Sequence, residues 1–329
     1  MQISLLMPHL KVGGGNRRYL EIANRLVKRG HQVEIYHPTG EQCAWTECLA
    51  KISPTLEIFQ KEHEVLMNSY PVRDEFEIVR RVKAELKLYY VLHLFECELM
   101  AGLHPTLYWR NEKTLYTKKS IKTADVVLAN STWQHNWIKE KLGVNNELLI
   151  GGVNFELFHP VPAAKDQTKI RLLYSGATKG WKNSVFVEEA LKIIKSKYPN
   201  VETASYYDQN IPQEKLARFY SSGDIFIDAQ VYGGWNNPVV EAMACGIPVV
   251  CSAIGSVQDF AFEGRTALLF KLGDLPSCVS QIEKLINSPE LRKTLSANAL
   301  AEVKRFTWDD CIAKFEQIIK ENLNLKHAS

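Results

Sequence analysis

Residues 231–252 read VYGGWNNPVVEAMACGIPVVCS, and this stretch decides the fold of the chain. Pro238 suits the first turn of a helix, because the N–H that proline lacks has no partner there. The mostly apolar residues 239–244 continue that helix, which Gly246 can end with a positive φ. Residues 247–251 are apolar, as is typical of a strand buried on both faces. The stretch therefore predicts the turn, helix and strand of an α/β protein.

One carboxylate, Glu241, lies close to the start of this helix. Such a residue usually interacts with the helix dipole on a solvated surface. Here it follows a glycine-containing turn, and open α/β sheets bind ligands where a strand passes through a turn into a helix. Glu241 is therefore a candidate ligand-binding residue.

Composition excludes several classes of protein. The 329 residues are 46% hydrophobic, which is enough for two domains of ordinary size, and the net charge of +3 is too small to indicate a nucleic-acid partner. No apolar run approaches 18 residues and no basic leader opens the chain, so we expect neither a membrane span nor a signal peptide. Seven cysteines without metal-ligand spacing fit a reducing compartment and no metal site. We expect a cytoplasmic protein.

Basic residues gather in residues 110–122, RNEKTLYTKKSIK. One interpretation is the solvated face of a helix. The other is a patch, Lys113 to Lys122, that contacts an anionic acceptor or the inner face of a membrane peripherally. The sequence leaves both open.

Strand-like and helical patterns alternate along the chain, which predicts parallel α/β layers. In the first half we expect a glycine turn at 13–15, a helix at 19–29, and strands at 3–7, 33–36, 89–95, 126–129 and 148–150. The polar, proline-containing residues 158–169 predict a linker. A second series follows, with strands at 170–175, 201–206, 225–228 and 267–270.

Residues 238–250, PVVEAMACGIPVV, resemble the nucleotide-sugar signature of the retaining family 4 glycosyltransferases, also named glycosyl transferases group 1. That family has the GT-B fold, in which two Rossmann-like, doubly wound domains face each other across a cleft. The resemblance implies an acceptor-binding domain at 1–158 and a nucleotide-sugar-binding domain at 169–306. It also implies that a last helix, at 307–325, packs back on the N-terminal domain.

The resemblance also implies functional residues. Glu241 takes the position that holds the donor ribose. The turn of Gly13, Gly14, Gly15 and Arg17 resembles the family's G-G-x-x-R turn and would line the cleft, although a plain tight turn is the alternative.

A second turn, residues 176–183, matches the family's diphosphate-binding turn through Gly176 and Lys182. The family's arginine is absent, since residue 177 is Ala, and Lys179 could supply the missing charge as a point charge. His93 stands near the family's cleft histidine, with a buried structural role as the alternative.

A second departure concerns the family's E-x(7)-E motif, because Gly233 occupies the position of the first Glu, which usually touches the transferred sugar. The neighbouring Trp235, Asn236 and Asn237, which precede Pro238, could bind the sugar in its place.

The predicted activity is transfer of a sugar from a nucleotide-sugar donor to a hydroxyl of a saccharide, a lipid-linked or a small-molecule acceptor, as in polysaccharide biosynthesis. No D-x-D sequence occurs, which fits the metal-independent, retaining chemistry that the resemblance implies. The donor is a substrate, and no cofactor is expected. Two alternatives remain: a GT-B nucleotide-sugar epimerase, and a non-catalytic nucleotide-sugar-binding protein.

Overall fold

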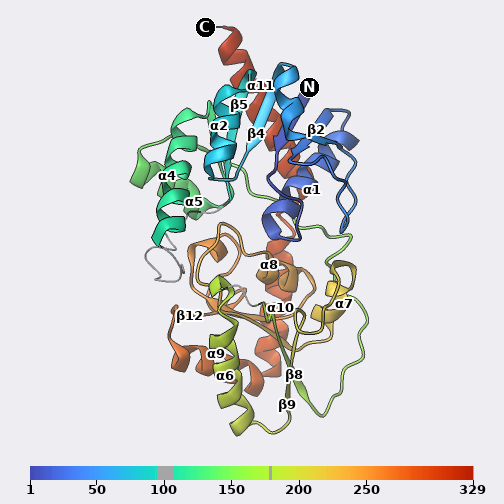
Figure 1. Ribbon diagram of the computed structural model, residues 1–329. Helices are drawn as coiled ribbons and strands as arrows, with labels where there is room; N and C mark the ends of the chain where they lie inside the picture. Colours follow the sequence, from blue (N-terminus) through green and yellow to red (C-terminus); the bar gives the residue numbers. More distant parts are fainter. Residues whose placement is uncertain (93, 95–106, 178–179, 329) are drawn as a thin grey trace. The chain divides into compact units, whose positions relative to one another are not determined.

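The computed structural model describes residues 1–92, 94, 107–177 and 180–328. The chain divides into two compact units, Met1–Gly152 with Trp308–Ser329, and Val153–Thr307 (Figure 1). In the described residues, each unit is built on one parallel sheet, of seven strands in the first unit and five in the second. The predicted α/β fold class is confirmed.

The sheet of the first unit has the strand order β3-β2-β1-β4-β5-β6-β7. Chain order reverses beside β1, which lies between β2 on one side and β4 on the other. The strands are β1 (Gln2–Leu6), β2 (Gln32–His37), β3 (Lys51–Pro54), β4 (His63–Asn68), β5 (Ala84–Val91), β6 (Val126–Ala129) and β7 (Glu147–Leu148).

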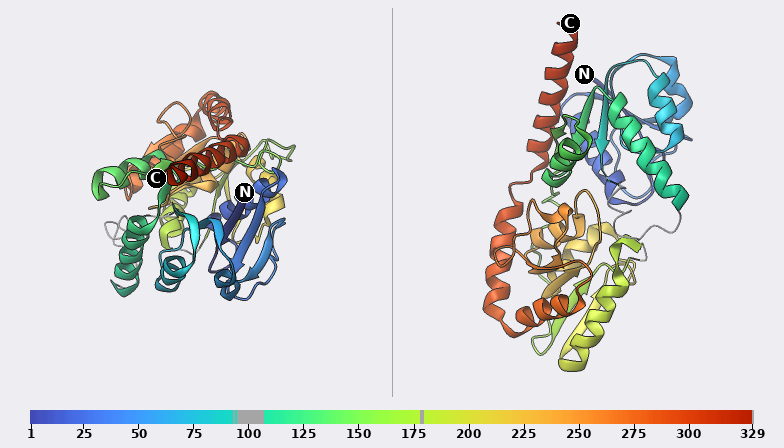
Figure 2. Two further views of the ribbon diagram at one scale, coloured as in Figure 1. Left: turned by 90° about the horizontal axis from the view of Figure 1, so that it is seen from above. Right: turned by 90° about the vertical axis from the view of Figure 1, so that its left-hand side faces the viewer.

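Helices cover both faces of this sheet (Figures 1 and 2). Alternate residues of β5 show the two faces: Leu88 joins the core under α1 (Gly14–Lys28) and α11 (Trp308–His327). Its neighbour Tyr89 joins the core under α4 (Leu107–Thr123) and α5 (Thr132–Leu142). A third cluster involves α2 (Arg73–Arg81) and the short helix η1 (Thr55–Gln60). The C-terminal helix α11 is therefore part of the first unit's core.

The sheet of the second unit has the order β12-β11-β10-β8-β9. One core cluster joins it to α6 (Ser184–Lys197) and α9 (Leu275–Asn287). Helix α8 (Asn237–Ala244) packs beside α7 (Leu216–Ser221) and α10 (Pro289–Val303). The strands are β8 (Ile170–Tyr174), β9 (Val201–Ser205), β10 (Ile225–Asp228), β11 (Val249–Ser252) and β12 (Leu268–Phe270), with the short helices η2 (Gly180–Lys182), η3 (Gln213–Lys215) and η4 (Gly255–Val257) between them.

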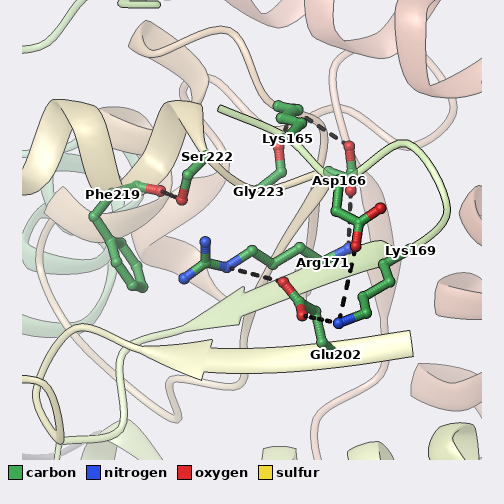
Figure 3. Close-up of polar contacts among 9 residues, drawn as sticks. Lys165, Asp166, Lys169, Arg171, Glu202, Phe219, Ser222 and Gly223 are labelled. Atoms are coloured by element: carbon green, nitrogen blue, oxygen red, sulfur yellow. Dashed lines mark hydrogen bonds and ion pairs between the residues drawn. The ribbon is translucent and has the colours of Figure 1, made fainter. Parts of the chain in front are cut away.

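A charged network fixes the chain that enters β8 (Figure 3). Glu202 on β9 pairs with Lys169 and Arg171, with N–O distances of 3.4 and 3.7 Å. Lys165 donates to the carbonyl of Gly223, just before β10. These groups lie at the amino ends of the strands, whereas parallel sheets bind ligands at the carboxyl ends, so this network has a structural role.

The structure corrects three sequence predictions. The predicted helix at 19–29 begins at Gly14, so the glycine turn is itself the first turn of α1. The predicted strand at 89–95 is β5, which ends at Val91. Strands β3 and β4 were not predicted. In β4, the polar His63 interrupts the run of apolar residues that would predict a strand. It is nevertheless buried, because its ring nitrogens form hydrogen bonds with Ser4 Oγ at 2.7 Å and with the carbonyl of Ile58 at 2.8 Å.

We predict that Phe315→Ala lowers the free energy of unfolding by about 3–5 kcal/mol, because Phe315 of α11 is fully buried in the first unit's core. The control Leu325→Ala, on the same helix at a position 68% exposed, should change it by less than about 0.5 kcal/mol. Urea titration measures both. Equal effects would contradict the packing of α11.

We also predict an acid-sensitive contact at α11. Glu316 accepts hydrogen bonds from Arg29 and His31, and the Arg29 guanidinium is the main cause that lowers the pKa of Glu316 to about 2. The ionised carboxylate therefore adds stability above about pH 4.5, and this contribution is lost as the pH falls towards 2.

Unfolding measured from pH 5 to 3 should show a smaller loss of stability in Glu316→Gln than in the wild type. Glu321→Gln, an exposed change on the same helix, should keep the wild-type loss. Parallel curves for all three proteins would contradict the role of Glu316.

Candidate functional site

Strand order indicates where each unit binds a ligand. In a parallel sheet, ligands bind beyond the carboxyl ends of the strands, at the point where chain order reverses. In the second unit this is the β8–β10 switch point, formed by the described residues 175–177 and 180–183 after β8 and by residues 229–236 after β10. In the first unit it is the β1–β4 switch point.

Two hydrogen bonds join the loops of the β8–β10 switch point. Lys182 Nζ donates to Oε1 of Gln230, and the backbone N–H of Val231 donates to the carbonyl of Trp181 at 2.9 Å. The Trp181 ring also packs near that of Tyr232, with centroids 5.9 Å apart. The predicted phosphate-binding Lys182 is thereby held against the loop that leads to α8.

Gly176 opens the first of these loops, and its conformation requires glycine. Its φ is +70°, and a Cβ at this position would lie 2.6 Å from Cβ of Ser205. The loop ends at Asn183, which precedes α6 and makes no capping bond through its side chain among the described residues. The first N–H groups of α6 therefore lie beside Lys182, an arrangement that favours an anion.

A buried carboxylate organises the second loop. Asp228, the last residue of β10, is 2% exposed. Its Oδ1 accepts from the backbone N–H of Gln230 at 3.0 Å and from Nδ2 of Asn236 at 2.7 Å. Within the part of the chain that the structure describes, Asp228 Oδ2, Asn236 Oδ1 and Ser256 Oγ are buried without hydrogen-bond partners. Asp228 thus sets the path of the loop and the position of Gln230.

Helix α8 follows directly and carries Glu241. This carboxylate is 5% exposed, and the hydroxyl of Tyr220 donates to its Oε2 at 3.3 Å. The helix begins at Asn237 and has Pro238 in its first turn, as predicted, and Gly246 has the expected positive φ. The Tyr220 ring packs on Phe226 in turn, so a large aromatic cluster supports the Glu241 side chain.

Trp235 lies among aromatic rings. It is 8% exposed and makes edge contacts with Phe260 and Phe306, at centroid distances of 4.8 and 5.1 Å. These contacts give Trp235 a packing role in the loop, and its predicted contact with a sugar remains a prediction.

The glycine turn of the first unit lies at the β1–β4 switch point. Gly13 precedes α1, Gly14 and Gly15 form its first turn, and the N–H of Arg17 donates to the carbonyl of Gly13 at 2.9 Å. The glycines thus follow β1, but Gly14 and Gly15 belong to α1 itself and do not form a separate turn before the helix, and their place in a cleft stays a prediction.

Three residues that the sequence did not indicate, His9, Tyr70 and Glu75, lie near this turn. His9, after β1, bonds Asn16 of α1 through Nδ1 and the hydroxyl of Tyr70, after β4, through Nε2, both at 2.9 Å. Nearby Glu75 of α2 is 4% exposed, and burial raises its pKa well above the ordinary value. Because β4 was not predicted, the sequence could not bring Tyr70 and Glu75 to this point.

Two predicted site residues, His93 and Lys179, lie outside the described residues. The second unit brings Gly176, Lys182, Asn236 and Glu241 to or beside one switch point, and Gln230 and Asp228 join them there. The sequence could have indicated Gln230 and Asp228, since polar residues at the end of a predicted strand point to the ligand-binding edge of a sheet.

The basic run lies on α4, where Lys119 stands 5.0 Å from the ring centroid of Tyr116 and 5.7 Å from that of Phe76. A contact of this run with a membrane or acceptor stays a prediction. Among the helices that the structure describes, none has the length and apolar character of a membrane span.

We predict that Gly176→Ala lowers the free energy of unfolding by roughly 1–3 kcal/mol, because of the positive φ and the overlap with Ser205. The matched control is Gly180→Ala in the same loop, where an added Cβ meets no atom within 4 Å. Thermal unfolding should separate the two variants. If neither variant lowered the free energy of unfolding, the positive φ of Gly176 and its close approach to Ser205 would be contradicted.

Comparisons with known proteins indicate what the chain is similar to. Residues 155–288 match the sequence model of the glycosyl transferases group 1 family. O-antigen chain mannosyltransferase B from Escherichia coli is 31% identical over 101 residues, which form 31% of this chain and 26% of that relative. The chain thus matches about a quarter of the relative's length.

Two solved structures share the fold along nearly the whole chain. Sucrose-phosphate synthase from Thermosynechococcus elongatus superposes with a TM-score of 0.77 at 17% identity and covers 100% of both chains. The Anabaena protein HepE in complex with UDP-glucose superposes with a TM-score of 0.69 at 16% identity, over 98% of this chain and 99% of that one. Residues 155–288 thus resemble the glycosyl transferases group 1 family, and the chain has the GT-B fold of these solved structures.

Proposed function

We propose that this protein is a retaining, metal-independent glycosyltransferase that moves a sugar from a nucleotide-sugar donor to a hydroxyl acceptor. The observation that carries the proposal is the arrangement at the β8–β10 switch point. There, Lys182 is bonded to Gln230, the first turn of α6 lies next to it, and Glu241 follows on α8. A cation beside open backbone N–H groups suits a diphosphate, and a carboxylate near them suits the hydroxyls of a ribose.

The chemistry needs charge stabilisation at the leaving group. As the bond between the sugar and the diphosphate breaks, negative charge grows on the phosphate oxygens. Lys182 and the amino end of α6 stabilise that charge, because both are fixed before the reaction begins. A leaving phosphate oxygen then takes the proton of the acceptor hydroxyl, which attacks from the same face of the sugar and so retains the configuration.

Glu241 has a binding role in this scheme. Its contact with the Tyr220 hydroxyl and the aromatic cluster behind it hold the carboxylate in place. A carboxylate accepts hydrogen bonds from two neighbouring hydroxyls, which is what a ribose presents. Glu241 therefore fixes the nucleoside, and Lys182 fixes the diphosphate.

The acceptor is assigned to the β1–β4 switch point of the first unit, where Gly13–Gly15, Arg17, His9 and Tyr70 gather. These groups supply hydrogen bonds to hydroxyls. Relatives with similar segments include a mannosyltransferase of O-antigen chains, and a protein of the same fold binds UDP-glucose, which supports a hexose donor and a saccharide acceptor.

A donor screen tests the function. Thermal unfolding is followed with UDP-, GDP-, ADP- and TDP-sugars, and a donor at 100 times its dissociation constant should add about 2.7 kcal/mol of stability. The donor found is then incubated with and without saccharide acceptors. Transfer to an acceptor supports the proposal, a new nucleotide sugar formed from donor alone indicates an epimerase, and binding without any reaction indicates a non-catalytic protein.

We predict that Lys182→Ala weakens binding of the matching nucleoside diphosphate by about 10–100-fold, since a charge-assisted hydrogen bond to phosphate contributes about 1.5–3 kcal/mol. Lys192→Ala, an exposed lysine of α6, is the control and should leave affinity unchanged within about two-fold. Calorimetric titration measures both. Equal affinities in the two variants would refute the role of Lys182.

We also predict that Glu241→Gln lowers kcat/KM by at least about ten-fold, because an amide accepts through one oxygen only and carries no charge. The melting temperature should change little, since the amide oxygen can still accept from Tyr220. Unchanged turnover would refute the assignment of Glu241.

A further inference from the structure

Gln230 joins the two loops of the β8–β10 switch point through one half of its side-chain amide, the oxygen Oε1. Its Oε1 accepts from Lys182, its backbone N–H donates to Asp228, and its carbonyl accepts from Ser252 Oγ. Among the described residues, no hydrogen bond has Gln230 Nε2 as its donor. Gln230, which is 4% exposed, is therefore held by two backbone hydrogen bonds and one side-chain hydrogen bond, and its NH2 group is left for another partner.

Gly233 leaves the space that this amide fills. A Cβ built on Gly233 would overlap Nε2 of Gln230 and lie 3.6 Å from its Cδ, while the next atom, Cβ of Ser256, is 3.8 Å away. The φ of Gly233 is outside the left-handed region, so its backbone accepts any residue. The restriction at position 233 is therefore the Gln230 amide and not the conformation of the chain.

We propose that Gln230 is a donor-binding residue whose Nε2 donates hydrogen bonds to oxygens of the donor's sugar-diphosphate group, and that Gly233 is required to leave room for it. This inference rests on the proposed function. The amide lies next to Lys182, so oxygens that reach the lysine also reach Nε2. Its two N–H groups donate hydrogen bonds to oxygen acceptors, whereas the carboxylate of an acidic residue at position 233 would only accept them.

The inference also accounts for the departure at position 233. The resemblance places an acidic residue there, and this chain has none. A side chain at 233 would displace the end of the flexible Gln230 side chain and break its bond to Lys182. The Gln230 side chain thus requires glycine at position 233, and the presence of Gln230 accounts for the absence of an acidic side chain there.

A set of variants tests this inference in the full-length protein. For the nucleotide sugar identified by the screen and for its nucleoside diphosphate, affinity is measured by calorimetry in wild type, Gln230→Ala, Gly233→Ala and the double variant. We expect Gln230→Ala to weaken nucleotide-sugar binding about ten-fold, and Gly233→Ala to weaken it to a similar extent. In the double variant, Gly233→Ala should add no further loss, because the amide that it displaces is already absent.

The two ligands separate the contacts of Nε2. An equal loss for both ligands places the contact at the diphosphate, and a loss confined to the nucleotide sugar places it at the sugar; both support the inference. The inference is overturned if Gln230→Ala binds both ligands like the wild type, or if the two single losses add in the double variant.

A matched control is available in the same unit. Gln281 on α9 is 8% exposed, and its Oε1 likewise accepts from a lysine, Lys284. Its amide donates to Glu263 and the carbonyl of Leu269, so all of it is engaged in structure. Gln281→Ala should lower the melting temperature and leave donor affinity unchanged. An equal loss of affinity in Gln281→Ala would show that Gln230 acts through stability alone. If the wild type binds no nucleotide sugar, the proposed function itself fails, an outcome separate from all of these.

Discussion

The hydrogen bond between Lys182 and Gln230 is the interaction on which the site depends. It joins the loop after β8 to the loop after β10, at the one place in this sheet where chain order reverses. At such a reversal the two loops run to opposite sides of the sheet. The hydrogen bond between Lys182 and Gln230 links them through their side chains. Lys182, which lies just before the amino end of α6, is positioned relative to the loop after β10 by this contact.

The bond is in turn supported from within the sheet. Asp228 lies at the end of β10, where a buried carboxylate is costly unless it accepts hydrogen bonds. It accepts from Gln230 and Asn236, and these two bonds set the path of residues 229–236. A buried carboxylate at the end of β10 thus determines the path of the largely buried loop that follows it. This arrangement explains how the chain can lack the acidic residue expected at position 233 and still present a defined set of polar groups.

Much of the second unit could be predicted from the sequence. The strand at Ile225–Asp228 and the start of α8 follow from short apolar runs between a proline and glycines, which is local information. The first unit was harder. Strand β4 contains His63, whose burial depends on a hydrogen bond with Ser4, 59 residues away in the sequence, as well as on the nearby carbonyl of Ile58. Without β4, the contact between His9 and Tyr70 could not be anticipated. In the same way, the proposed role of Gln230 depends on the absence of a side chain at Gly233. The sequence alone does not show that these two residues lie against each other.

A crystal structure of the protein with a bound nucleotide sugar tests the central claim most directly. The account predicts the diphosphate between the loops that follow β8 and β10, within hydrogen-bond distance of Lys182 Nζ, with the ribose at Glu241. A nucleotide sugar bound elsewhere, with the bond between Lys182 and Gln230 far from any ligand atom, would contradict it.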